Sequence, residues 1–514
     1  MENPQRSSDA GTFVSYNPAT GDPLGEVPIQ SAQEVRDAVA RAHAAQHAWA
    51  ALEPGERGRR VLAFRDSIVK NAEDIAARIS RENGKTRIEA MAAEVFLIAD
   101  LATYFAKRAD KLLAPKPITM HLLKHRRSYL HYVPRGVVGI IAPWNFPFSI
   151  PLSEAIMALI AGSAVVIKPS EVTLLIALHA KALWDETGLP KDLLQVVTGE
   201  GATGRALIES NVQQIIFTGS VATGRKVAAA CGERLIPCIL ELGGKAPAIV
   251  CEDADLERTA RALTWGAFMN SGQVCASVER VYVPEKIHDA LVTRIRELAG
   301  ALRQGDPSQH DTDVGAVCFA HQLVVAETQV RDAVEKGAQV VVGGQRKSGV
   351  GQFFAPTVLT GCQQDMRVMR EETFGPLMPI MKVRDEEEAI ALANDSHLGL
   401  VAYVFGADRT RARRIAERVQ AGTVMINDVL GSYAMPETPW GGVKQSGLGR
   451  THSDDGLRDL CETRHVHYNL LPAGQRELWW YPYGEKTWGI ARRLVRGLFG
   501  KNAAEKVSAL VFGR

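Results

Sequence analysis

Short apolar runs that alternate with helical stretches constrain the fold of this chain more than any other feature of its sequence. Residues Tyr129–Ile141 are rich in β-branched side chains, and further apolar runs follow, separated by stretches with helical character. Those runs are Ala164–Ile167, Leu194–Val197, Gln214–Thr218 and Cys238–Leu242. Short, mostly apolar runs are typical of strands that are buried on both faces. Strands alternating with helices predict an α/β fold with a doubly wound parallel sheet.

A second α/β series follows between Ala246 and Asn427. Its predicted strands are Ala246–Val250, Arg280–Val283, Gln339–Val342 and Thr423–Ile426. Ahead of both series, Ser31–Leu113 carries apolar residues at spacings of three and four, which indicates helices. A chain of 514 residues suggests about three domains of roughly 150 residues each. We expect two α/β domains with smaller pieces left over.

The composition excludes several classes of protein. The chain has 60 basic and 58 acidic residues, which argues against a generally polybasic nucleic-acid binder. Its 7 cysteines are scattered without a C-x-x-C pair, so we expect neither a metal site nor a disulfide framework. Residues Met1–Gly11 lack the apolar core of a signal peptide, and Ala155–Ile167 is too short to span a bilayer. A cytoplasmic location is the expectation.

Cys275 is the first candidate for chemistry. Glycine and polar residues lie on both sides of it, from Asn270 to Arg280. A nucleophilic thiolate needs such a polar, partly open setting, whereas a buried core thiol does not. These flanks favour a reactive cysteine over a structural one.

Glu241 is the second candidate. It ends the apolar run Cys238–Leu242 and precedes the pair Gly243-Gly244. A carboxylate buried there is costly unless it is paired or used. The alternatives are a salt bridge to Lys245 and a functional acid beside a tight glycine turn.

Four further segments could each be functional or merely structural turns. They are Pro143-Trp144-Asn145-Phe146-Pro147, Lys168-Pro169-Ser170-Glu171, Phe217–Gly224 and Glu371–Pro376. The first holds an amide suited to stabilising an oxyanion, and the second lies at a strand end, where α/β sheets bind ligands. The third offers glycines and hydroxyls for a phosphate at a helix N-terminus, although the G-x-G-x-x-G fingerprint is absent.

The order of these segments resembles the aldehyde dehydrogenase superfamily. The motifs are P-W-N-F-P, K-P-S-E, F-T-G-S-x-x-x-G, L-E-L-G-G-K, G-Q-V-C and E-E-T-F-G-P, and the resemblance extends from about Tyr16 to about Tyr468. It implies oxidation of an aldehyde to the carboxylic acid with reduction of NAD(P). Cys275 would be the nucleophile, Asn145 and the Cys275 N–H the oxyanion hole, and Glu241 the base that activates the hydrolytic water.

The resemblance also implies a set of dinucleotide contacts. They are Trp144, Lys168, Glu171, Gly219, Ser220, Glu372 and Phe374. Lys168 and Glu171 would hold the adenosine ribose, and a carboxylate there accepts a hydrogen bond from a free 2′-hydroxyl but repels a 2′-phosphate. At about 4 Å and an effective dielectric near 20, two like charges cost about 4 kcal/mol. NAD is therefore expected, with NADP as the alternative.

The remaining contacts follow the same resemblance. Trp144 and Ser220 would approach the pyrophosphate, Glu372 would bind the nicotinamide ribose, and Phe374 would pack beside the ring.

The domain plan of such relatives also transfers. It implies a dinucleotide-binding domain of residues 1–116 and 134–243, and a catalytic domain of residues 244–441. A β-arm of residues 117–133 and 463–471 would pair subunits into a homodimer or homotetramer.

Residues 472–514 form an extension that relatives often lack. Within it, residues 485–501 are amphipathic, with apolar side chains over about half of the helix circumference and arginines opposite. Packing on this protein or a neighbouring subunit is one interpretation. Peripheral membrane contact is the other.

Substrate and reaction type leave alternatives open. Leu430, Tyr433 and Met435 lie in a segment expected to line the pocket mouth, and they suggest apolar aliphatic or aromatic aldehydes. The absence of arginine from Asp428–Met435 argues mildly against a semialdehyde. A CoA-acylating dehydrogenase, a thiol hydrolase and a non-enzymatic scaffold are the competing functions, and Glu241 favours hydrolysis by water.

Overall fold

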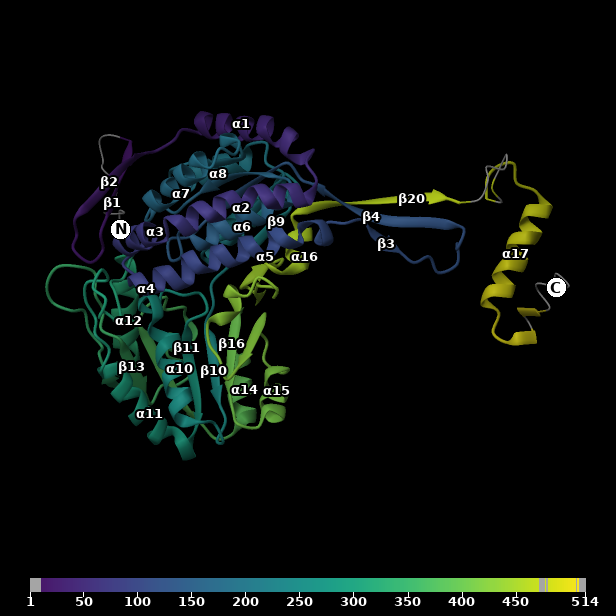
Figure 1. Cartoon of the computed structure of the whole chain (residues 1–514). Helices are drawn as coiled ribbons and strands as arrows, with labels where there is room; N and C mark the ends of the chain where they lie inside the picture. Colours follow the sequence, from purple (N-terminus) through teal and green to yellow (C-terminus); the bar gives the residue numbers. More distant parts are fainter. Residues whose placement is uncertain (1–10, 471–476, 478, 505, 508–514) are drawn as a thin grey trace. The chain divides into compact units, whose positions relative to one another are not determined.

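The computed structural model describes residues 11–470, 477, 479–504 and 506–507, and it contains two compact units (Figure 1). Unit 1 comprises Met1–Ala114 and Tyr132–Thr463, and unit 2 comprises Pro115–His131 and Arg464–Arg514. Parts of the predicted cofactor domain, arm and tail lie outside the described residues: 1–10, 471–476, 478, 505 and 508–514. The domain boundaries given above remain predictions.

The first sheet of unit 1 has the predicted parallel arrangement. Five neighbouring strands run parallel in the order β9, β8, β5, β6, β7, and the short β19 pairs antiparallel with β9. Their bounds are β5 Val137–Ile141, β6 Ala164–Lys168, β7 Leu194–Val196, β8 Gln214–Thr218, β9 Cys238–Glu241 and β19 Gly447–Leu448. The predicted run Tyr129–Ile141 is two strands rather than one, because β4 (Arg126–Pro134) ends at a proline and Gly136 turns the chain with a φ of 131°.

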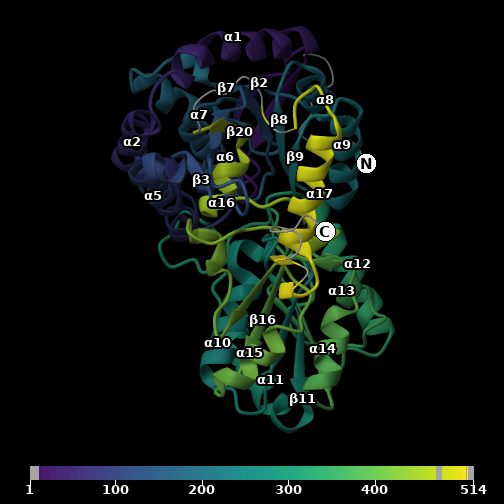
Figure 2. The ribbon, with the colours of Figure 1, turned by 90° about the vertical axis from the view of Figure 1, so that its right-hand side faces the viewer.

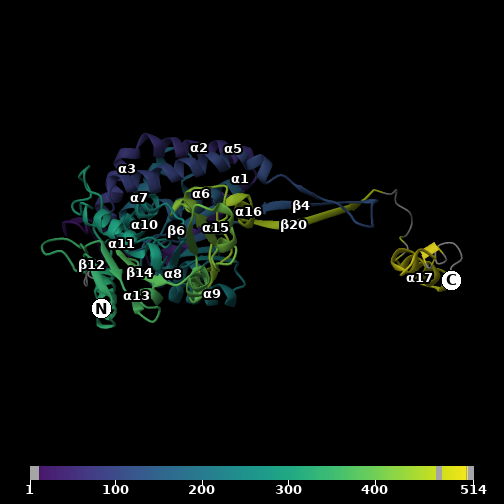
Figure 3. The same cartoon turned by 90° about the horizontal axis from the view of Figure 1, so that it is seen from below.

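Helices cover both faces of this sheet. Figure 3 shows α2 and α5 on one side of it and α8 and α9 on the other. The helices of this part of the chain are α1 Ala32–Ala50, α2 Pro54–Lys70, α3 Ala72–Asn83, α4 Arg87–Ala90, α5 Leu97–Leu112, α6 Ser149–Ala161, α7 Leu174–Glu186, α8 Gly201–Glu209 and α9 Val221–Glu233. Between α4 and α5 lies a π-helical segment, Met91–Phe96, and a 3-10 turn, Lys191–Leu193, precedes β7. Helix α1 begins at a capping box. The Glu34 N–H donates to the Ser31 hydroxyl, and the Ser31 N–H donates to the Glu34 carboxylate.

The second sheet forms the lower lobe of unit 1, with α10, α11, α14 and α15 around it (Figure 2). Its order is β12, β13, β14, β11, β10, β16, β17, and only β12 runs antiparallel to its neighbour. The strands are β10 Ala246–Val250, β11 Val278–Pro284, β12 Gln339–Val342, β13 Thr357–Thr360, β14 Leu377–Val383, β16 Val401–Phe405 and β17 Thr423–Ile426. The helices are α10 Leu256–Phe268, α11 Glu285–Gly300, α12 His321–Glu335, α13 Arg367–Arg370, α14 Glu386–Asn394 and α15 Arg409–Ala416.

Smaller elements complete unit 1. They are the β1–β2 hairpin (Thr12–Tyr16, Pro23–Pro28), the pair β15–β18 (Leu398–Gly399, Val443–Lys444), the 3-10 turns Met269–Gly272 and Gly431–Ala434, and α16 (Ser453–Asp459). A three-stranded sheet, ordered β20, β4, β3, lies mostly in the residues of unit 2 and includes β3 (Lys116–Ile118) and β20 (Cys461–Asn469). In unit 2, α17 spans Glu485–Phe499, within the segment predicted to be amphipathic.

The most apolar stretch of the sequence forms part of the core of unit 1. All residues of α6 and of β6 are buried, and both elements belong to one hydrophobic cluster. Among the described residues, no helix combines the length and apolar character that crossing a membrane requires.

Candidate active site

Four of the segments identified in the sequence leave the first sheet at the same edge. Pro143–Phe146 follows β5, Lys168 ends β6, Gly219 follows β8, and Glu241 ends β9. These strands are neighbours and run parallel, so their carboxyl ends meet at one edge of the sheet. The sheet order brings together segments that are far apart in the chain.

Cys275 reaches this edge from the other lobe, on the connection between α10 and β11. Just before it, Asn270 and Ser271 hold positive φ values of 51° and 55°, an unfavourable conformation for residues with side chains. The backbone N–H of Asn270 donates to Glu89 over 2.8 Å, and the Ser271 hydroxyl donates to the carbonyl of Gly315 over 2.9 Å. These bonds from other segments hold the strained turn that presents Cys275.

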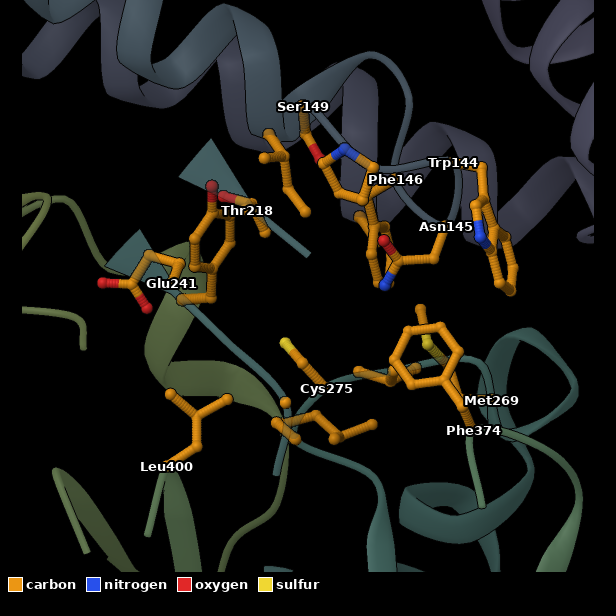
Figure 4. Close-up of a pocket in the computed structure, with 18 of the residues that line it drawn as sticks. Trp144, Asn145, Phe146, Ser149, Thr218, Glu241, Met269, Cys275, Phe374 and Leu400 are labelled. Atoms are coloured by element: carbon orange, nitrogen blue, oxygen red, sulfur yellow. The ribbon is translucent and has the colours of Figure 1, made fainter. Parts of the chain in front are cut away.

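A cavity of about 590 Å³ contains most of the predicted site residues. Ten of them line it: Trp144, Asn145, Gly219, Ser220, Glu241, Cys275, Glu372, Phe374, Leu430 and Tyr433. Figure 4 shows Cys275 with Glu241 on one side and Asn145 and Phe374 on the other. Lys168, Glu171 and Met435 do not line the cavity, and the Met435 side chain is 42% exposed.

Asn145 is held in place by a buried ion pair. Lys85 Nζ lies 2.6 Å from Glu94 Oε1 and donates to the backbone carbonyl of Asn145 over 2.8 Å. The other carboxylate oxygen of Glu94 accepts from the backbone N–H groups of Phe148 and Ser149. The Asn145 side-chain amide donates to the carbonyl of Gln273, two residues before Cys275, over 3.1 Å. The amide donor is thus fixed beside the cysteine turn.

Glu241 is a buried carboxyl whose two oxygens accept no hydrogen bond from the described residues. The salt bridge to Lys245 considered from the sequence is wrong, because Lys245 Nζ bonds to Glu279 over 2.7 Å. Burial, followed by the nearby carboxyl of Glu154, raises the pKa of Glu241 well above its usual value, although the Arg450 charge and the nearby Trp440 indole, which lies outside hydrogen-bonding geometry, oppose the shift. A raised pKa makes the carboxylate a stronger base than an exposed glutamate.

Burial, with the carboxyls of Glu372 and Glu241 nearby, raises the pKa of the Cys275 thiol to about 12. A thiol with this pKa is protonated at neutral pH, so a base must remove its proton before it can attack.

On the other side of the cavity, Glu372 and Phe374 form a wall close to Gly243. The Gly244 N–H donates to Glu372 over 2.8 Å, and a Cβ on Gly243 would lie 2.4 Å from a carboxylate oxygen of Glu372. At Gly244 a Cβ would lie 2.4 Å from the backbone carbonyl oxygen of Cys275, so only glycine fits there, which explains one of the two glycines after Glu241. The Phe374 ring meets the Trp144 ring edge-on, with centroids 5.3 Å apart. Burial, and then the charge of Glu279, raises the pKa of Glu372 to about 8.

At the carboxyl ends of β6 and β8 lie the other predicted contacts. Lys168 Nζ lies 3.4 Å from Glu171 Oε2. Ser220, which lines the cavity, caps α9, since its hydroxyl accepts from the Thr223 N–H over 3.2 Å.

Tyr433 and Leu430 line the cavity from the segment predicted as its mouth. The Tyr433 hydroxyl lies 2.9 Å from Ser153 Oγ, and its ring packs edge-on against Trp440 at 5.2 Å. The rest of the wall is mainly apolar, and it includes Phe146, Ile150, Trp265, Met269 and Val274.

Sequence reasoning missed two buried acids of this cavity, Glu89 and Glu154. Glu154 lies on α6, and burial raises its pKa to about 7. The available signal was a single carboxylate in an otherwise apolar helix. Together with Glu241 and Glu372, four carboxyls line the cavity, and no lysine, arginine or histidine of the described chain is among its lining residues.

The arrangement offers a thiol, a fixed amide donor and an unpaired carboxyl around one cavity. These groups can add sulfur to an electrophilic carbon, hold the resulting oxyanion and activate a water. No group of three His, Cys, Asp or Glu side chains in the described part of the chain is placed to hold a metal ion.

Comparison with known proteins gives a consistent result. Residues 5–466 match the model of the aldehyde dehydrogenase family. The putative succinate-semialdehyde dehydrogenase [NADP(+)] of Mycolicibacterium smegmatis is 39% identical over 449 residues, which cover 87% of each chain. The 4,4'-diapolycopene aldehyde oxidase of a Methylomonas species is 35% identical, over 96% of this chain and 92% of the relative. The NAD+ complex of an aldehyde dehydrogenase from Bacillus cereus superimposes with a TM-score of 0.86 and 32% identity, over 90% of this chain and 94% of that one.

Proposed function

The chain belongs to the aldehyde dehydrogenase family, and we propose that it oxidises uncharged, apolar aldehydes through a thioester on Cys275. The family establishes oxidation of an aldehyde with NAD or NADP. The observation that carries the residue roles is the single cavity in which Cys275, Asn145 and Glu241 meet.

The reaction begins at the sulfur. Cys275 loses its proton to solvent, and the resulting thiolate attacks the aldehyde carbon and forms a C–S bond while the carbonyl electrons move to oxygen. The Asn145 amide and the Cys275 N–H donate to that oxygen and stabilise the charge that develops there. When bound, NAD(P) accepts the hydride that leaves the same carbon, and a thioester to Cys275 remains.

Hydrolysis then frees the enzyme. Glu241 removes a proton from water, the water oxygen attacks the thioester carbon, and the C–S bond breaks with the thiolate as leaving group. The raised pKa of Glu241 suits this role, because its carboxylate is a stronger base than an exposed one. The product is the carboxylic acid, and the covalent intermediate divides the reaction into a two-electron oxidation and a hydrolysis.

The residues present fit a dinucleotide at the sheet edge. The N-terminus of α9 at Ser220 offers free backbone N–H groups to a phosphate. Lys168 and Glu171 would bind the adenosine ribose, Trp144 and Gly219 would lie near the phosphates, and Glu372 and Phe374 would contact the nicotinamide half. The carboxylate of Glu171 favours NAD over NADP in this proposal.

The charges of the cavity support an uncharged substrate. No basic residue lines the described cavity, so the carboxylate of a semialdehyde would find no opposite charge to pair with there. This argues against transferring the succinate-semialdehyde activity of the mycobacterial relative to this chain. The apolar walls and the similarity to 4,4'-diapolycopene aldehyde oxidase support a long apolar aldehyde instead.

The β-arm supports a homodimer or homotetramer. In the sheet β20–β4–β3 the edge strand β20 is exposed along most of its length, and exposed edges pair readily with another strand. Sedimentation equilibrium of the whole chain tests this part of the proposal, and a monomeric mass contradicts it.

An aldehyde panel tests the function. Alkanals of increasing length, benzaldehyde and succinate semialdehyde are assayed with NAD and with NADP, each with and without CoA. The proposal predicts kcat/KM that rises with chain length and is lowest for succinate semialdehyde, with free acid as product. A preference for the semialdehyde overturns the substrate class, and faster formation of acyl-CoA than of free acid overturns the hydrolytic step.

A further inference from the structure

The end of the chain presents large apolar side chains to solvent. We call the following set the tail surface: Trp479, Trp480, Tyr481, Tyr483, Trp488, Val495, Leu498 and Phe499, with the basic residues Lys486, Arg492, Arg493 and Arg496. Trp488 is 71% exposed, Phe499 63% and Trp480 57%. Soluble proteins rarely leave so many neighbouring aromatic side chains uncovered, so such a patch marks an interaction site.

Helix α17 separates apolar from basic side chains. Trp488, Val495 and Phe499 are seven and four residues apart, which places them on one face of the helix. Arg493 projects from the opposite face, and Arg492 and Arg496 lie along the border of the apolar face. The helix therefore has an apolar side on which Trp488, Val495 and Phe499 are exposed, and a cationic side.

The aromatic residues before α17 are held in an ordered turn. The backbone N–H of Trp480 donates to the backbone carbonyl of Glu477 over 3.0 Å, and the Tyr483 hydroxyl donates to the backbone carbonyl of Trp479 over 3.1 Å. The rings of Tyr481 and Tyr483 pack together with centroids 4.6 Å apart. The turn holds these rings near the start of the helix, yet they remain exposed.

We propose that the tail surface binds an anionic lipid bilayer, with α17 lying in the plane of the interface. Tryptophan and tyrosine are the side chains that favour the boundary between headgroups and acyl chains. An amphipathic helix with Trp, Leu and Phe on one side and arginine on the other is the pattern of interfacial binding.

The charge of α17 favours lipid over a second copy of this chain. The helix has four basic residues, Lys486, Arg492, Arg493 and Arg496, against one acidic residue, Glu485. Two such helices packed together would bring arginines against arginines, whereas anionic headgroups provide the opposite charge. Lipid therefore satisfies both faces at once.

Lipid binding bears on the substrate, and this extension rests on the proposed function. Long apolar aldehydes partition into bilayers, so an enzyme bound to the bilayer surface meets them at a higher concentration than one in solution. The lipid contact itself does not depend on the catalytic proposal, so the two fail independently.

Vesicle co-sedimentation of the full chain tests the lipid contact. The probes are phosphatidylcholine vesicles with and without phosphatidylserine, at low and at high salt. The variant R492Q/R493Q/R496Q removes three charges from α17, and R409Q/R413Q/R414Q removes three exposed charges from α15 as the matched control. Each basic residue near an anionic surface contributes about fivefold, so the tail variant is expected to bind about a hundredfold more weakly.

A second pair of variants tests the apolar face. W488S/F499S is expected to lose most vesicle binding, and full-length protein is expected to lose binding in high salt or without phosphatidylserine. Turnover of a water-soluble aldehyde is expected to stay unchanged in every variant, which separates this test from the test of catalysis.

Two outcomes overturn the proposal. One is equal vesicle partition of the full chain, the tail variants and the α15 control. The other is a change in oligomeric mass of W488S/F499S with unchanged vesicle binding, which identifies the tail surface as a contact between subunits.

Discussion

Lys245 bonds to Glu279 over 2.7 Å, and both side chains are buried. This pairing leaves Glu241, four residues before Lys245, as a buried carboxyl without a hydrogen-bond donor from the described residues. Burying a carboxyl in this way costs stability, and chains keep such groups where a reaction uses them.

Glu241→Gln is expected to slow turnover at neutral pH by about 10²- to 10⁴-fold, because the amide cannot take a proton from water. The first turnover is expected to persist in part, so that a burst of reduced cofactor precedes a slow steady state. Stopped-flow absorbance of the reduced nicotinamide measures both phases. The exposed Glu335→Gln on α12 is the control, and an unchanged steady-state rate in Glu241→Gln contradicts the assignment.

Glu154→Gln is expected to move the acid limb of the pH–rate profile to lower pH. The negative charge of Glu154 raises the pKa of Glu241, so its removal lowers that pKa and ionises the base at lower pH. The profile of kcat between about pH 5 and 9 measures the shift. A limb that stays in place, or that moves to higher pH, shows that Glu154 does not act on the base.

Asn145→Ala is expected to lower kcat by about 10²- to 10³-fold, since it removes one of two donors to the oxyanion. Binding of the cofactor is expected to change little, because the Lys85–Glu94 pair holds the backbone of this segment and not its side chain. Steady-state kinetics and fluorescence titration with NAD separate the two quantities. A loss confined to KM would point to substrate binding instead.

Glu171→Gln is expected to raise kcat/KM for NADP relative to NAD by at least about tenfold. The substitution removes a charge repulsion of about 4 kcal/mol in an unscreened pair, and solvent reduces the effect because Glu171 is partly exposed. Parallel assays with the two cofactors give the ratio, with the neighbouring helix variant Glu186→Gln as control. If the ratio of kcat/KM for NADP to that for NAD does not change, the adenosine ribose does not bind at Glu171.

The parallel strands were predictable because their short apolar runs are buried on both faces. Ala164–Ile167 and Gln214–Thr218 became β6 and β8 with nearly the predicted ends. The strands β13, β14 and β16 were not identified. Although β14 and β16 are apolar, the stretches around them lack the clear helical periodicity that would mark where a strand begins and ends. The β1–β2 hairpin pairs by backbone contacts across a polar turn. Its sequence shows little alternation of apolar and polar residues, so it gave no strand signal.

The site was predictable in its members but not in its electrostatics. Motif order pointed to Cys275, Asn145 and Glu241, yet the pairing of Lys245 with Glu279 and the position of Glu154 depend on how α6, β9 and β11 pack. Met435 was expected in the pocket mouth from its apolar character alone, and a one-dimensional pattern cannot tell which side chains of a turn face inward. The four-glutamate lining arises from segments far apart in the chain and is visible only in three dimensions.

The most direct test of the central claim is the mass of the enzyme trapped during turnover. Glu241→Gln is mixed with a long-chain alkanal and NAD, quenched with acid after one turnover, and digested for peptide mass mapping. The account predicts that the peptide with Cys275 gains the mass of the acyl group and that no other cysteine does. An unmodified Cys275 peptide after a full burst of reduced cofactor, or an acyl group on another of the 7 cysteines, contradicts it.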